Sequence, residues 1–149
     1  MCADARRRRG VEPNEPPAAA TIQRALKAVR AASNGWSVDL SAFGAAVALR
    51  LPDHPRPGGE TLETGALITL PPDQTIHTAE RYLIVEHLER YLHLMGTHGW
   101  RLGREIPPVQ LVPVAGRYWH FDGKHRIAVA RLLDLPLRAR LRRVTAGDA

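Results

Sequence analysis

The sequence of 149 residues holds one cysteine, few aromatic residues and no long apolar run, and each shortage excludes a class of protein. Cys2 alone cannot form a disulfide within the chain, which excludes a disulfide-stapled secreted domain and fits a reducing compartment. No apolar run approaches the roughly 20 residues of a membrane-spanning helix. Prolines and acids, rather than an apolar segment, follow the basic start, which argues against a secretory signal. We therefore expect a cytoplasmic protein without a membrane partner.

Aromatic residues make up only 5% of the chain, but a hydrophobic share of 44% is enough for a core of Leu, Val, Ile and Ala. Residues 1–20 are rich in Arg, Pro and Ala and show no structural period. We expect them to form a disordered basic tail. Residues 21–149 are then expected to form a single domain.

The net charge of +6 is unevenly distributed. Residues 21–116 hold nine basic and nine acidic side chains, whereas residues 117–149 hold eight basic and only three acidic ones. A local excess of this kind indicates an anionic partner such as phosphate, nucleotide or nucleic acid. A solvated basic face is the alternative.

Hydrophobic periodicity predicts a mixture of helices and strands. Residues 78–95 carry the clearest helical stripe, with Thr75 or Thr78 as its cap and Glu80 in its first turn. The last forty residues predict a strand, a tight turn, a second strand, a helix and a third strand. The expected helices are 21–33, 78–95 and 124–133, and the expected strands are 45–51, 65–70, 109–114, 117–121 and 137–144.

The helix expected at Lys124 is apolar on nearly every side, yet its first turn carries three basic residues. Cations are unfavourable at a helix N-terminus unless an anion lies in front of them. Gly123 lets the backbone turn sharply, and Asp122 can cap the helix or face a metal ion that accompanies phosphates. Lys124 and Arg126 are expected to hold phosphate oxygens, and His125 to fix the turn or donate to a phosphate. In the plainer alternative Asp122 only caps the helix and the cations extend into water.

The stretch Trp119-His120-Phe121-Asp122-Gly123-Lys124-His125-Arg126-Ile127-Ala128 resembles the ParB/sulfiredoxin superfamily. The resemblance is best over residues 107–144 and extends weakly back to about Leu67. It implies an α/β fold (α+β in arrangement), with a βαβ core in a small mixed sheet packed by two or three helices. It also implies a nucleotide, ATP, ADP or CTP with Mg²⁺, at the helix N-terminus.

Departures from the superfamily's patterns separate its branches. Lys124 stands where sulfiredoxins carry a catalytic cysteine, so reduction of sulfinic acids is not expected. Of the Gly-Glu-Arg-Arg turn of partition proteins only Gly123 and Arg126 match, and the chain ends 23 residues later, so a complete partition clamp is not expected. Asp-Gly-x-His-Arg is the pattern of the free-serine kinases, which need an upstream carboxylate as general base. Asp73 and Glu80 are the candidates by order along the chain.

The resemblance and the residues together predict a nucleotide-binding domain that transfers a phosphoryl group to a small-molecule acceptor or hydrolyses the nucleotide. Such chemistry is mostly positioning and charge neutralisation. The alternative is a DNA-associated ParB-like module, or a ParB-like nuclease, of a bacterial plasmid or phage system. Its support is the basic strand face formed by Arg138, Arg140 and Arg142. For Arg126 we expect that replacement by alanine abolishes nucleotide binding and leaves the fold intact.

Overall fold

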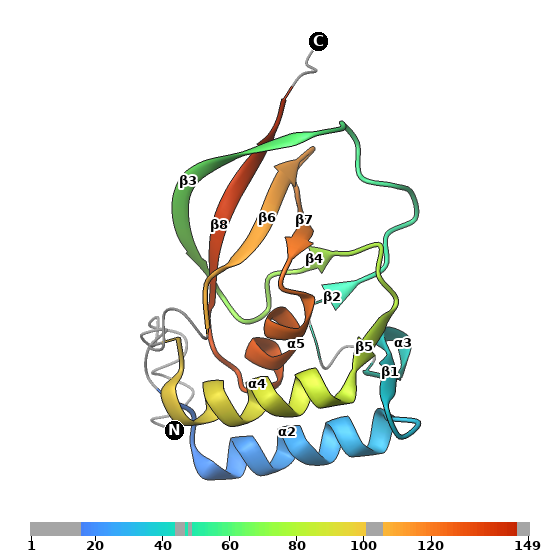
Figure 1. The fold of residues 1–149 in the computed structure, drawn as a ribbon, viewed down its shortest axis with the longest axis vertical. Helices are drawn as coiled ribbons and strands as arrows, with labels where there is room; N and C mark the ends of the chain where they lie inside the picture. Colours follow the sequence, from blue (N-terminus) through green and yellow to red (C-terminus); the bar gives the residue numbers. More distant parts are fainter. Residues whose placement is uncertain (1–15, 44–46, 48, 101–105, 146–149) are drawn as a thin grey trace.

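The computed structural model describes residues 16–43, 47, 49–100 and 106–145. Three helices of nine or more residues, one short helix and eight strands lie in these ranges (Figure 1). In chain order they are α2 (Ala19–Ala32), β1 (Ser37–Asp39), α3 (Leu40–Phe43), β2 (Leu49–Arg50), β3 (Thr61–Leu70), β4 (Ile76–His77), β5 (Tyr82–Ile84), α4 (Val85–His98), β6 (Val109–Val114), β7 (Arg117–Asp122), α5 (Lys124–Leu132) and β8 (Leu137–Val144).

A mixed six-stranded sheet forms the centre of the fold, in the order β2-β4-β7-β6-β8-β3. β2, β4 and β7 run parallel, β6 pairs antiparallel with β7 and parallel with β8, and β3 closes the edge antiparallel to β8. The chain follows the expected strand–helix–strand order through α5, but β6 lies between β7 and β8, which run in opposite directions. β1 and β5 form a separate antiparallel pair. This arrangement confirms the expected α+β fold with a mixed sheet.

The three longer helices lie in layers on one side of the sheet, with α5 against the strands, α4 against α5 and α2 outermost (Figure 1). The apolar stripe of α4 supplies Leu88, Leu92 and Met95 to the core, each almost fully buried. α5 is buried on nearly all sides, as its composition predicts, and Ile127 and Val129 lie in the same core. No helix in the described ranges is long and apolar enough to cross a membrane.

The last forty residues agree best with expectation. β6 and β8 have the predicted bounds, β7 is one residue longer and α5 one residue shorter. α2 begins at Ala19, two residues before the predicted start, and residues 1–15 of the expected tail lie outside the described residues. Of the strand expected over 45–51, only Leu49–Arg50 forms β2, while residues 44–46 and 48 lie outside the description. β3 extends four residues before its predicted start.

The helix predicted from residue 78 is wrong in its first seven residues. The segment Tyr82–Ile84 is strand β5, whose Leu83 is fully buried opposite Val38 of β1. The Thr78 hydroxyl accepts the backbone N–H of Glu80 in a local turn, so it does not cap a helix. α4 therefore starts at Val85, and Glu80 lies in the segment between β4 and β5 rather than in a helical first turn.

Candidate functional site

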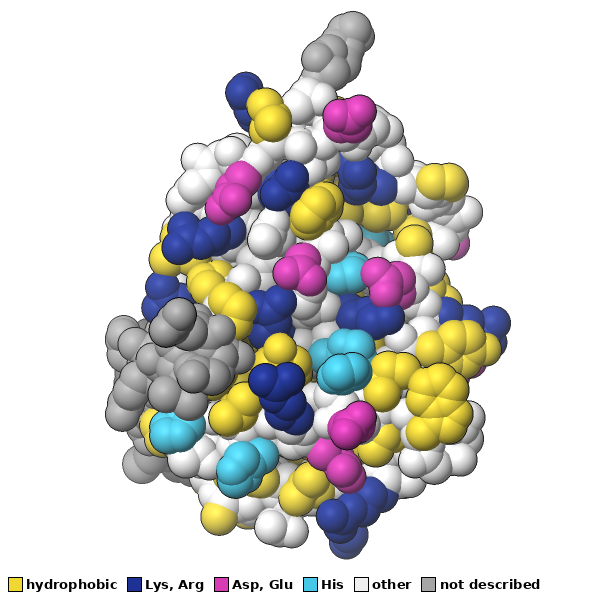
Figure 2. All heavy atoms as spheres, in the orientation of Figure 1, with side chains coloured by type: hydrophobic (Ala, Val, Ile, Leu, Met, Phe, Trp, Pro, Cys, Tyr) yellow, Lys and Arg dark blue, Asp and Glu magenta, His cyan; other side chains and the backbone are white. Residues whose placement is uncertain are grey.

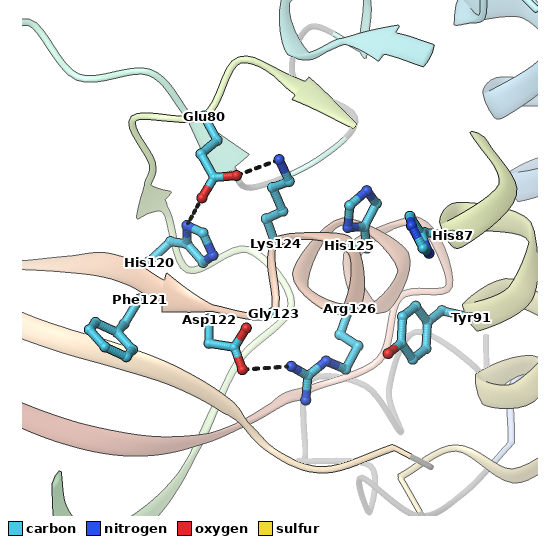
Figure 3. A pocket seen from close by; sticks show the side chains of 10 residues that line it. All are labelled: Glu80, His87, Tyr91, His120, Phe121, Asp122, Gly123, Lys124, His125 and Arg126. Carbon is cyan, nitrogen blue, oxygen red and sulfur yellow. Dashed lines mark hydrogen bonds and ion pairs between the residues drawn. The ribbon is translucent and has the colours of Figure 1, made fainter. Parts of the chain in front are cut away.

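A pocket of about 240 Å³ opens at the N-terminus of α5, where β7 ends. Charged and histidine side chains gather around it near the centre of the face shown in Figure 2. It combines the expected motif with side chains from α4 and from the segment before β5 (Figure 3). The lining residues are Glu80, His87, Tyr91, His120, Phe121, Asp122, Gly123, Lys124, His125 and Arg126.

Gly123 makes the turn from β7 into α5, and only glycine fits there. Its φ of 104° and ψ of 29° lie in the left-handed region. A Cβ at this position would lie 2.7 Å from Cγ1 of Val109 and 2.9 Å from Nη2 of Arg126. No side chain caps α5, so the interpretation of Asp122 as the cap is wrong. The first-turn N–H groups of α5 therefore have no side-chain acceptor, which leaves this helix end suited to an external anion.

Lys124 is already paired with a carboxylate from a distant part of the chain. Its Nζ donates to Oε1 of Glu80 at 2.5 Å. This hydrogen bond is the main reason why the pKa of Glu80 lies below its usual value, although burial opposes it. Glu80 is thus held ionised, while about half of its side chain (54%) stays exposed to solvent. Asp73, the other candidate base, lies exposed in the turn after β3 and does not line the pocket.

His120, which the sequence did not indicate as a site residue, lies beside Glu80 and Thr78. Its Nδ1 lies 3.0 Å from the hydroxyl of Thr78 and 3.9 Å from Oε2 of Glu80. Burial lowers the pKa of His120 despite the neighbouring carboxylate, so the ring is neutral at pH 7. The same Thr78 hydroxyl accepts the backbone N–H of Glu80, so one residue contacts both the His120 ring and the Glu80 backbone. A histidine in a strand gave no periodic signal that could have identified this role.

His125 ties the start of α5 to the junction of β5 and α4. Its Nε2 accepts the backbone N–H of Ile84 at 2.9 Å, which requires that this nitrogen carry no proton. Burial, with help from the charge of Lys124, lowers its pKa to about 4. The ring of His87 lies 5.0 Å away, centroid to centroid. This hydrogen bond holds the first turn of α5 against the start of α4, and both expected roles of His125 at the site stay predictions.

Arg126 is directed towards the protein itself. It is buried, with 6% of its surface exposed, and its Nη1 donates to the carbonyls of Pro107 and, at 3.3 Å, Pro108. Its Nη2 lies 3.5 Å from Oδ2 of Asp122, and the guanidinium lies 6.0 Å from the ring centroid of Tyr91. These contacts anchor the segment that enters β6 to the pocket wall. The expected contact of Arg126 with phosphate stays a prediction.

The arginines of β8 do not line the pocket themselves, and they lie on the strand face opposite the buried Leu137 and Ala139. Arg140 donates to the carbonyl of Gly65 at 3.4 Å. Arg142 makes three hydrogen bonds within the sheet and covers the ring of Phe121. Two of the three guanidinium groups expected to contact DNA are therefore used to join strands.

Two carboxylates, Glu80 and Asp122, line the pocket, and the side chain of Asp122 is 63% exposed. Among the described residues no group of three or more His, Cys, Asp and Glu side chains is arranged to hold a metal ion. The pocket's two cations face its two carboxylates as pairs (Figure 3). The four charged side chains Lys124, Arg126, Glu80 and Asp122 therefore sum to no net charge, and His120 and His125 are neutral and add none.

Comparison with known proteins gives one match of fold. No protein-family model and no curated protein matches the chain. Sulfiredoxin from Arabidopsis thaliana has a similar structure over 52% of this chain and 85% of its own, with 19% sequence identity and a TM-score of 0.39.

Proposed function

We propose that the pocket binds the phosphates of a Mg²⁺-bound nucleotide, ATP, ADP or CTP, and transfers a phosphoryl group from the triphosphate to water or to a small-molecule hydroxyl. One observation carries the proposal: the uncapped, basic N-terminus of a buried helix opens into a pocket that also holds two carboxylates. Backbone N–H groups, the helix dipole and Lys124 together provide an anion site. Gly123 allows a phosphate to approach the backbone closely.

The charge balance of the pocket supports a requirement for a divalent cation. A nucleoside triphosphate brings about four negative charges at pH 7, and the four paired side chains supply no net positive charge to offset them. Mg²⁺ is commonly held by one or two carboxylates together with phosphate oxygens and waters. Asp122, the more exposed of the two carboxylates, suits this role. Lys124 would then exchange its bond to Glu80 for one to a phosphate oxygen.

Glu80 is the candidate general base. As a carboxylate it can accept the proton of the attacking water or hydroxyl while that oxygen bonds to the terminal phosphorus and the bond from phosphorus to the bridging oxygen breaks. The His120 ring lies beside the carboxylate of Glu80, and the Thr78 hydroxyl accepts its backbone N–H. We expect Glu80→Gln to lose phosphate release from ATP while Mg²⁺-ATP still binds. Equal turnover by the variant would remove Glu80 from the mechanism.

The test of binding is isothermal titration with Mg²⁺-ATP, ADP and CTP at millimolar concentrations. Lys124→Gln should weaken affinity about tenfold to a hundredfold, the value of one charge-assisted contact. Lys27, exposed on α2, is the only other lysine of the chain, so Lys27→Gln is the matched control and should bind like the wild type. Absence of heat with all three nucleotides would refute the proposal.

DNA binding through Arg138, Arg140 and Arg142 is the second candidate. One observation favours it: along β8 the three arginines alternate with Leu137, Ala139 and Leu141, and this period of two places them on a single face. Arg140 and Arg142 already donate to acceptors within the sheet, so fewer of their donors are available to DNA phosphates, and we place DNA binding after nucleotide binding. Binding to DNA phosphates should weaken steeply between about 50 and 200 mM salt, whereas the nucleotide pocket should respond much less.

A further inference from the structure

Phe121 is unusual among the exposed apolar side chains of the described ranges. Six large hydrophobic residues there are substantially exposed, and Phe121, at 46%, is the only one of them that lines the pocket. Figure 3 shows its ring beside Asp122, on the other side of Gly123 from Tyr91. An aromatic ring left in water beside a polar pocket loses the favourable free energy of burial unless something covers it.

One face of the ring is already covered by a fixed cation. The guanidinium of Arg142 lies 3.9 Å from the centroid of the Phe121 ring. Its Nε and Nη2 donate to Oγ1 and the carbonyl of Thr61 at 2.7 and 3.1 Å, and its Nη1 donates to Oε1 of Gln110 at 3.0 Å. Arg142 occupies one face of the ring, while 46% of the surface of Phe121 stays exposed. A ligand that contacts this ring would therefore do so on the face opposite Arg142.

The backbone places Phe121 at this position through an irregularity in the sheet. Gln110 pairs with Asp122 and Leu111 pairs with His120, so Phe121 is the extra residue of a β-bulge between β6 and β7. Bulges beside functional sites redirect a side chain that a regular strand would place elsewhere. Here the redirected side chain immediately precedes the Asp122-Gly123 turn, so the ring and the anion site belong to one pocket.

We infer that Phe121, backed by Arg142, is the stacking surface for the base of the bound nucleotide, and that the ligand is therefore a nucleoside polyphosphate rather than an inorganic one. The inference rests on the proposed function and adds a contact for the base of the nucleotide, which the phosphate site does not recognise. Base-on-aromatic stacking needs one open ring face, and a cation on the far face stabilises the stack.

The experiment compares two ligands, Mg²⁺-ATP and Mg²⁺-tripolyphosphate, which share the phosphates and differ in the nucleoside. The wild type should bind ATP about tenfold or more tightly than tripolyphosphate. Phe121→Ala should lower ATP affinity to that of tripolyphosphate and leave tripolyphosphate affinity unchanged. Phe121→Trp, which keeps an aromatic ring at this position, should prefer ATP over tripolyphosphate as the wild type does. Trp36→Ala, which removes an exposed aromatic ring outside the pocket, is the control and should keep both affinities.

The outcomes separate this inference from the proposed function. If the wild type binds both ligands equally, or if Phe121→Ala weakens both equally, the base does not stack on Phe121 while the phosphate site stands. If the wild type binds neither ligand, the proposed function itself fails. Circular dichroism of each variant verifies that the compared proteins are folded, as expected for changes at exposed side chains.

Discussion

Replacement of Arg126 by alanine should destabilise the protein strongly, although the motif alone favours a ligand contact whose loss spares the fold. The guanidinium is buried and donates to the carbonyls of Pro107 and Pro108. It is also paired with Asp122 across the start of α5. Alanine would leave a cavity beside the entry to β6 and two carbonyls without their donor.

The magnitude follows from these contacts. A hydrogen bond to a charged group contributes about 1.5–3 kcal/mol, and water entering the vacated space recovers part of that loss. For the two carbonyls together we expect about 3–5 kcal/mol, a large share of the roughly 5–15 kcal/mol of a typical domain. A domain of this size loses about 3 °C of Tm per kcal/mol, so Tm should fall by roughly 10–15 °C.

Urea unfolding followed by circular dichroism measures this loss. Arg131→Ala is the control on the same helix, because that side chain is 28% exposed and its pair with Asp134 is long, at 3.8 Å. The control should change stability by no more than about 1 kcal/mol. A wild-type urea midpoint for Arg126→Ala would show that the carbonyl contacts contribute nothing and would return Arg126 to a ligand role alone.

Three further predictions concern the same turn. Gly123→Ala should cost roughly 2 kcal/mol or more in urea unfolding, because φ is positive and the new Cβ would overlap Val109; an unchanged midpoint would mean that the turn relaxes freely. Glu80→Gln should raise the affinity for metal-free pyrophosphate several-fold, since Lys124 loses its ionic partner, and an unchanged Kd in titration would contradict this. Acid should destabilise the fold through His125, because below pH 6.5 the unfolded chain binds a proton that the folded chain does not bind until about pH 4. Urea midpoints should fall between pH 7 and pH 4, and His125→Gln should flatten that slope.

The sequence predicts the last forty residues well because their signals are local. In β8 apolar and basic residues alternate, and that period of two defines the strand and its buried face without reference to the rest of the chain. The tight turn at Ala115-Gly116, both at positive φ, sets the hairpin between β6 and β7. The position of the site follows in the same way, from a glycine between a strand and a buried helix.

Elements decided by distant partners were not predictable. The apolar stripe of α4 continues back through Ile84, so the pattern alone extends the helix too far. Pairing of the segment Tyr82–Ile84 with β1 ends it, and β1 lies more than forty residues earlier. β2 and β4 have two residues each, which is too short for any period, and exist because they extend the parallel pairing from β7.

For the site, too, the sequence predicts the position but not the contacts of each residue. The motif predicts an anion site, but the contacts of each motif residue depend on a partner far away in the sequence. Lys124 meets Glu80 at a separation of 44 residues, His125 meets Ile84 at 41, and Arg126 meets Pro107 at 19. Because of these partners Lys124 is an ion-paired cation, His125 is a neutral ring, and Arg126 is a buried side chain bonded to backbone carbonyls. The free positive charge that the motif suggests is therefore absent from these side chains, and a bound nucleotide would have to depend on helix N–H groups, an exchangeable lysine and an added metal ion.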